Sequence, residues 1–223
     1  EGYNVTVLDL KTDNLDSLCE KYDSLLSLTC DVRDLKQMKV CVSESVRKYG
    51  SIDCAVHNAC MCTFGSMEQT GEQVYHDVME VNYYGALHLS RAVLPYMKSL
   101  RNGKVIFTSS CVGIMGFINI SPYSSSKGAI EALAKCLNIE YQNYAISFHI
   151  FHPPLTRTKS AEPLPVPKEF MADPEKVGIG LAKHIRSKSF IICHSLGQKI
   201  QILICCLFPV KMGKLMSKMT AGY

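Results

Sequence analysis

The alternation of short apolar runs with longer amphipathic segments constrains the fold of this chain more than any other feature of its sequence. The runs have the length of buried strands, and the segments between them repeat apolar residues at helical spacing, as Ala129, Leu133 and Leu137 do. The predicted strands are Val5–Leu10, Leu25–Cys30, Ile52–Val56, Val105–Thr108, Ile146–Phe151 and Phe190–Cys193. Because strands separated by helices pair in parallel through right-handed crossovers, we expect an α/β fold with a doubly wound parallel sheet.

Capping residues and prolines indicate where the predicted helices begin and end. Asp34 caps a helix that Gly50 ends, and Asp173 caps a second helix that runs from Pro174 to Arg186. Further helical patterns cover Glu72–Leu100 and the residues after Pro122, and a loop is expected at Pro163, Pro165 and Pro167.

The length and charge of the chain limit its domain organisation and its partners. With 223 residues, 47% of them hydrophobic, the chain suits a single α/β domain with a large core. We assign residues 1–195 to this domain and residues 196–223 to an apolar and basic C-terminal extension of it. The net charge of +4 is mild, and the sequence has no long Lys/Arg block, so nucleic acid is not an expected partner.

The cysteines predict buried, reduced thiols rather than a disulfide framework or a metal site. There are 11 of them, scattered along the chain, which is typical of a cytoplasmic protein. Cys60 and Cys62 lie close together, as do Cys205 and Cys206, but neither pair has a second pair nearby to complete a zinc site. We therefore expect no metal.

The segment from Ser110 to Lys127 carries the strongest chemical signal. Tyr123 and Lys127 are four residues apart, so they share one face of the helix predicted after Pro122. A phenol has a pKa of ~10, and a neighbouring ammonium is expected to lower it, which makes the pair a candidate proton shuttle. Ser110 follows a predicted strand and could steady the alkoxide that forms when a carbonyl is reduced. The alternative is a chance surface pair.

The surrounding motifs resemble those of the short-chain dehydrogenase/reductase family over roughly residues 1–190. In chain order they are Asn58-Ala59-Cys60, Val81-Asn82-Tyr83-Tyr84-Gly85, Ser110, Tyr123 with Lys127, and Pro153-Pro154-Leu155-Thr156-Arg157-Thr158. The resemblance implies a Rossmann-like dinucleotide-binding catalytic domain, an oxidoreductase that interconverts a carbonyl and an alcohol, and a homodimer or homotetramer.

The resemblance also implies a role for each catalytic candidate. Tyr123 would exchange a proton with the carbonyl oxygen, Lys127 would hold the nicotinamide ribose, and Ser110 would position the carbonyl. Asn82 would anchor a water molecule that connects Lys127 to solvent. Two alternatives stay open: Asn82 could bridge backbone groups at a helix irregularity, and Ser110 could be an ordinary turn residue.

The expected cofactor is NAD or NADP. Asp9 ends the first predicted strand, where an acidic residue binds the adenosine ribose and favours NAD, although it could simply cap the next turn. Lys11 could still accept a phosphate. By resemblance, Asp31 and Val32 would contact the adenine. The remaining cofactor-binding candidates are Asn58, Ala59, Tyr123, Lys127, Pro153, Leu155, Thr156 and Thr158.

Three departures from the family pattern stand out. Cys60 replaces a glycine that permits close backbone approach. His57 stands where asparagine is common in the family, and we interpret it as a packing residue. The family's first strand and glycine-rich phosphate-binding turn are not in this sequence. We therefore expect a gap in the sheet between the strands Val5–Leu10 and Ile52–Val56, an N-terminally incomplete sequence, and weak dinucleotide binding by this polypeptide.

The substrate is expected to be hydrophobic. The Pro153-Pro154 turn and Ser90-Arg91-Ala92-Val93 resemble the 3-ketodihydrosphingosine reductase branch, whose members reduce a keto-sphingoid base with NADPH. The apolar run Ile200–Val210, with lysines after it, is too short to span a bilayer, which needs ~20 residues. It could be a packing or oligomer element, a cover over the substrate pocket, or a peripheral membrane contact. A second hypothesis for the chain is a non-catalytic dinucleotide-binding or scaffold protein.

Overall fold

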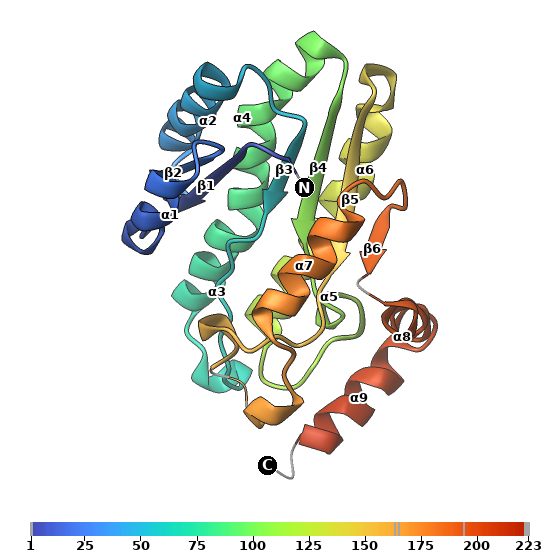
Figure 1. Cartoon of the computed structure of the whole chain (residues 1–223). Coiled ribbons are helices and arrows are strands. Elements are labelled where there is room, and N and C mark those ends of the chain that lie inside the picture. Colours follow the sequence, from blue (N-terminus) through green and yellow to red (C-terminus); the bar gives the residue numbers. More distant parts are fainter. Residues whose placement is uncertain (1, 163, 165, 194, 221–223) are drawn as a thin grey trace.

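The computed structural model describes residues 2–162, 164, 166–193 and 195–220, and it shows strands and helices in alternation (Figure 1). Within these residues the strands are β1 (Val5–Asp9), β2 (Leu25–Thr29), β3 (Cys54–His57), β4 (Gly103–Thr108), β5 (Ile146–His152) and β6 (Ile191–Cys193). Each lies within two residues of its predicted bounds. Of the three prolines predicted to form a loop, Pro163 and Pro165 lie outside the described residues.

The strands pair in parallel, which confirms the predicted fold class, but they form two sheets. One sheet has the order β1-β2, and the other has the order β3-β4-β5-β6. No ladder joins β1 to β3 in the described part of the chain. The gap predicted between these two strands is therefore present.

Capping residues begin and end the helices as predicted. The carboxylate of Asp34 accepts backbone hydrogen bonds at the start of α2 (Leu35–Tyr49), and Gly50 ends that helix with a φ of 87°. The carboxylate of Asp173 caps α7 (Pro174–His184) in the same way. The helix that carries the catalytic motif is α6 (Ser121–Glu140), with proline in its first turn.

The single helix predicted over Glu72–Leu100 is wrong in one respect. The structure divides it into α3 (Glu72–Met79), a π-helical turn η3 (Glu80–Tyr84) and α4 (Gly85–Leu100). Asn82 lies in the π-helical turn, and this position explains its contacts at the candidate site.

Helices cover both faces of the four-stranded sheet (Figure 1). On one face, α2, α4 and α6 pack over a core that includes Phe107 and Phe148. On the other face, α7 packs over Ile106, Phe151 and Ile192 through Val177. Since both faces are buried, the carboxyl ends of the strands are the natural place for a ligand.

The C-terminal extension forms two helices, α8 (Leu196–Leu207) and α9 (Pro209–Thr220), which pack against the short α5 (Val112–Met115). Gly213 lies so close to α5 that a Cβ there would be 2.7 Å from the carbonyl oxygen of Met115. No single helix among the described residues is long and apolar enough to cross a bilayer. The adjacent helices α8 and α9 reach the required length and apolar content only together, and they are bent by 117° relative to each other.

Candidate active site

Ser110, Tyr123 and Lys127 lie together at the carboxyl end of β4. Ser110 is two residues beyond β4, and its side chain lies close enough to Tyr123, in the first turn of α6, to influence the pKa of the phenol. Lys127, one turn further on, is 1% exposed, and its Nζ lies 5.5 Å from the centre of the Tyr123 ring. The ammonium donates a 2.8 Å hydrogen bond to the carbonyl oxygen of Thr108, the last residue of β4. The three predicted catalytic side chains thus share one site.

Burial controls the protonation of this site. It raises the pKa of Tyr123 well above its ordinary value, and the thiols of Cys60 and Cys62 raise it further, while the side chain of Ser110 lowers it. Burial also lowers the pKa of Lys127. The expectation of a lowered Tyr123 pKa is therefore wrong as the net effect, because desolvation of the phenol is the largest influence on it. At neutral pH Tyr123 holds its proton and can give it to a carbonyl oxygen.

Asn82 joins the loop after β3 to helix α6. Its fully buried amide accepts a 2.8 Å hydrogen bond from the N–H of Met61 and donates one of 3.0 Å to the carbonyl oxygen of the same residue. It also donates to the hydroxyl of Ser126, the residue before Lys127. The structure thus shows the backbone bridge at a helix irregularity, whereas the water-anchoring role stays a prediction.

Two cysteines of the loop after β3 belong to the site, although the sequence did not indicate them. The thiols of Cys60 and Cys62 lie close enough to the Tyr123 hydroxyl and the Lys127 ammonium to influence the pKa of both groups. Burial is the main reason that the pKa of Cys62 is raised to about 12. The available signal was the replacement of the family's glycine by Cys60, which adds a side chain at this point.

The turn after β3 is fixed by a hydrogen bond and by close packing. Asn58 accepts a 3.0 Å hydrogen bond from the hydroxyl of Thr108, so Asn58 and Ala59 lie beside the end of β4. His57 is buried against Gly85, where an added Cβ would lie 2.8 Å from its Nε2. Burial lowers the pKa of His57 to about 3, so it is a neutral packing residue.

The residues expected at the adenosine end lie at the carboxyl ends of β1 and β2. Asp9 is exposed, and its carboxylate accepts a 3.2 Å hydrogen bond from the N–H of Lys11, which is the turn-capping alternative. Asp31 forms hydrogen bonds and an ion pair with Arg33, which hold its pKa below the ordinary value. The Asp31 carboxylate would have to exchange this partner to contact an adenine.

The turn after β5 carries the residues expected at the nicotinamide, and backbone contacts fix its shape. Leu155 accepts a 2.7 Å hydrogen bond from the N–H of Ala172, which directly precedes the cap of α7. The hydroxyl of Thr156 donates to the carbonyl oxygen of Pro154, and the N–H of Thr158 donates to that of Thr156. Pro153 directly follows β5, so this turn begins beside the end of β4.

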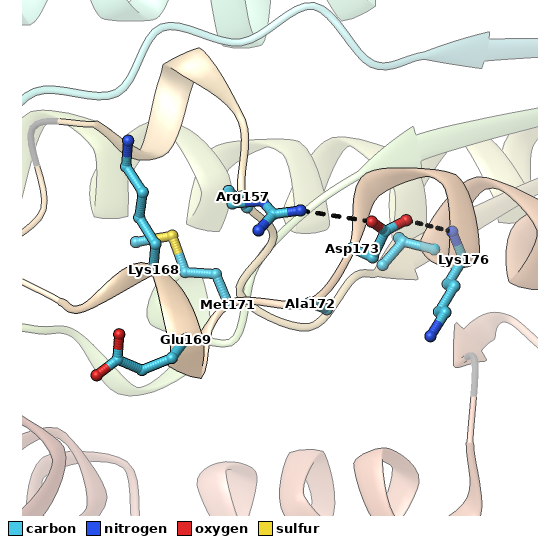
Figure 2. A pocket seen from close by; sticks show the side chains of 8 residues that line it. Arg157, Lys168, Glu169, Met171, Ala172, Asp173 and Lys176 are labelled. Carbon is cyan, nitrogen blue, oxygen red and sulfur yellow. Dashed lines mark hydrogen bonds and ion pairs between the residues drawn. The ribbon is translucent and has the colours of Figure 1, made fainter.

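A hollow of about 430 Å³ adjoins this turn (Figure 2). Arg157 reaches into it and lies 3.5 Å from the carboxylate of Asp173. The residues that line the hollow are Arg157, Lys168, Glu169, Met171, Ala172, Asp173, Lys176 and Val177. None of the three clustered catalytic side chains lines it, so the hollow is separate from the proton-transfer site.

Comparison with known proteins decides the family. The model of the short chain dehydrogenases matches residues 1–168, three quarters of the chain. The chain belongs to the short-chain dehydrogenase family. It is 34% identical over 135 residues to a 3-ketodihydrosphingosine reductase of Bos taurus, covering 60% of this chain and 41% of that protein. It is 31% identical over 169 residues to the 3-oxoacyl-(acyl-carrier-protein) reductase of Thermotoga maritima, covering 74% and 69%.

Solved structures of this family share the fold. A short-chain dehydrogenase from Streptomyces avermitilis matches with a TM-score of 0.81 and 26% identity, covering 99% of this chain and 89% of that one. An NADPH-bound carbonyl reductase from chicken fatty liver matches with a TM-score of 0.76 and 19% identity, covering 85% and 84%. The chain spans about two fifths of the length of the 3-ketodihydrosphingosine reductase that it matches.

Proposed function

We propose that the chain carries the catalytic site of a reductase that uses NADH or NADPH to convert a ketone on a hydrophobic substrate to an alcohol. The observation that carries this proposal is the cluster of Ser110, Tyr123 and Lys127 at the end of β4, with the phenol protonated at neutral pH. A protonated phenol is the form that a reduction needs, because the carbonyl oxygen must gain a proton.

Each side chain of the cluster has a defined task. The hydroxyls of Ser110 and Tyr123 hydrogen-bond to the substrate carbonyl oxygen and steady the negative charge that develops on it. Tyr123 then gives its proton to that oxygen. The ammonium of Lys127, held by the carbonyl of Thr108, stabilises the phenolate left behind. The bound dinucleotide supplies the hydride.

The residues present fit both ends of a dinucleotide. Asp9 and Asp31 place carboxylates at the ends of β1 and β2, where a ribose and an adenine would lie. Tyr123, Lys127 and the turn Pro153–Thr158 would flank the nicotinamide end. The described residues offer no glycine-rich turn for the pyrophosphate. Asp9 favours NAD, whereas the 3-ketodihydrosphingosine reductase resemblance and the NADPH-bound carbonyl reductase favour NADP.

The proposed substrate class is a long-chain ketone such as a keto-sphingoid base. Similarity to 3-ketodihydrosphingosine reductases supports it, and so does the extension, because α9 packs on α5, whose first residue comes two positions after Ser110. An apolar wall next to the catalytic serine suits an aliphatic chain.

We further propose that this protein is cytoplasmic and binds peripherally to an anionic membrane through α8 and α9. Eight large apolar side chains on these two helices are more than half exposed: Leu196, Ile200, Leu203, Leu207, Phe208, Val210, Leu215 and Met219. The lysines Lys199, Lys211, Lys214 and Lys218 are exposed too, and residues 195–223 contain no acidic residue. Apolar area and positive charge on one element are typical of a membrane-surface helix.

Vesicle sedimentation tests the membrane contact. Vesicles that contain phosphatidylserine should pellet the protein, and neutral phosphatidylcholine vesicles should pellet less of it. Leu203→Glu should release the protein from both, whereas Glu140→Ala, at the exposed end of α6, should not. Equal binding of wild type and Leu203→Glu would refute the contact.

We expect the protein to be a homodimer or homotetramer, which analytical ultracentrifugation would check.

A substrate screen with both cofactors tests the reductase proposal. Long-chain keto-amines, steroids and short ketones are offered to the wild type and to Tyr123→Phe, and oxidation of NADH or NADPH is followed. Loss of the phenol should cost ~10²–10⁴-fold in rate. Tyr144→Phe, on a tyrosine that packs against Tyr141, is the matched control. A Tyr123→Phe protein as active as the wild type would instead favour the second hypothesis, a dinucleotide-binding scaffold without catalysis through this site.

A further inference from the structure

Glu131 places a carboxylate among the segments that carry the catalytic side chains. It lies on α6 one turn after Lys127, and its side chain is only 13% exposed. The proposed chemistry does not use it. A buried carboxylate is costly unless polar partners surround it, so its contacts explain why it is tolerated.

The Glu131 carboxylate contacts the ends of both central strands. Its Oε1 accepts a 2.9 Å hydrogen bond from the hydroxyl of Ser109, the buried residue that directly precedes Ser110. The same oxygen lies 3.2 Å from Nε2 of His152, the fully buried last residue of β5. The N–H of Ser109 also donates to the carbonyl of Phe151, so the two strand ends are tied to each other and to α6.

These contacts connect the three segments on which the site depends. α6 carries Tyr123 and Lys127, the end of β4 leads to Ser110, and the end of β5 leads to the turn Pro153–Thr158. An apolar residue at position 131 could fill the same space without the desolvation cost, but it would supply no directional bond between the segments. The carboxylate therefore contributes alignment in addition to packing.

We propose that Glu131 is a positioning residue that holds Ser110 and the nicotinamide-facing turn in register with Tyr123. The inference rests on the proposed reductase function, since it assigns a task within that site. A shift of ~1 Å in a reacting group can cost ~10²-fold in rate, so a link of this kind affects turnover more than substrate binding.

Steady-state kinetics of four proteins test the role: wild type, Glu131→Ala, Glu131→Gln and the surface control Glu140→Ala. Glu131→Ala should lower kcat about 10- to 100-fold with KM for the ketone changed less than about threefold. Glu131→Gln keeps an oxygen that accepts from Ser109, so it should retain kcat within about threefold of wild type. A kcat for folded Glu131→Ala within about twofold of wild type, or no rescue by Gln, would overturn the proposal.

Hydrogen exchange measured by mass spectrometry decides the question without activity. Glu131→Ala should raise exchange in the peptides that cover 107–113 and 152–158, while Glu131→Gln and Glu140→Ala should leave both peptides unchanged. Unchanged exchange in both segments of Glu131→Ala would overturn the positioning role. Wild-type protein inactive on every ketone at NADH and NADPH concentrations that saturate its dinucleotide binding would refute the reductase proposal instead, and the exchange comparison would still decide the role of Glu131.

Discussion

His57 makes the stability of this protein depend on acid in a way that one substitution should remove. Its ring is 2% exposed at the end of β3, and burial, followed by the nearby charge of Lys127, lowers its pKa from 6.5 to about 3. A folded-state pKa below the unfolded value means that the unfolded chain takes up the proton first. The stability from neutral His57 is therefore complete above pH 6.5 and is lost as the pH falls toward 3.

The size of the loss follows from the shift in pKa. Each pH unit inside this window costs about 1.4 kcal/mol of unfolding free energy, so His57 alone should remove about 2 kcal/mol by pH ~5 and about 4–5 kcal/mol by pH ~3. This is a large share of the 5–15 kcal/mol typical of a folded domain. The loss should therefore be measurable at pH ~5, where most carboxylates are still ionised.

Urea unfolding followed by circular dichroism at pH ~7 and pH ~5 measures the effect. His57→Asn, which places a residue common in the family at this position, should reduce the drop between the two pH values by about 2 kcal/mol. His184→Asn, on an exposed histidine of α7, should leave the drop unchanged. An equal drop for wild type and His57→Asn would show that His57 is not held neutral by burial, and the reasoning would fail.

Three further predictions concern the catalytic cluster. Cys60→Gly should lower the pKa of Tyr123 by removing one of the groups that raise it, so the alkaline loss of reductase activity should move to lower pH, as a pH–rate profile would show. Gly113→Ala would place a Cβ 2.9 Å from the backbone carbonyl carbon of Lys127. Thermal unfolding should therefore show a loss of about 1–3 kcal/mol in the free energy of unfolding. No loss would mean that α5 moves away from α6 freely. Lys127→Met removes a buried charge, so its free energy of unfolding should stay within about 2 kcal/mol of the wild-type value. Its rate of ketone reduction should nevertheless fall sharply. A variant that does not fold would contradict this prediction.

The elements of the fold that depend on local pattern were predictable from sequence. Strand β5 is buried on both faces, so its apolar run predicted it, and the caps Asp34 and Asp173 each form the predicted hydrogen bonds. The π-helical turn was foreseen only as one of two alternatives for Asn82, because the helical pattern of the sequence continues through Glu72–Leu100. It depends on the hydrogen bonds between Asn82 and Met61, which are 21 residues apart in the chain.

The candidate site divides in the same way. Tyr123 and Lys127 meet because they are one helical turn apart, and Ser110 joins them because β4 ends beside α6. The raised pKa of Tyr123 was not predictable, since desolvation depends on everything packed around the ring. The contact between Glu131 and His152 was equally hidden, because it joins α6 to the end of a strand formed later in the chain.

The π-helical turn has an evolutionary consequence for the chain. One additional residue inside a helix rotates everything after it by about 100°, and here α3 packs on α6 while α4 packs on α2 and the sheet. Deleting one residue from Glu80–Tyr84 would restore a regular helix but would turn one of these two packed faces toward solvent. A single-codon deletion within this turn is therefore expected to be strongly destabilising, so the bulge should persist in descendants of this chain.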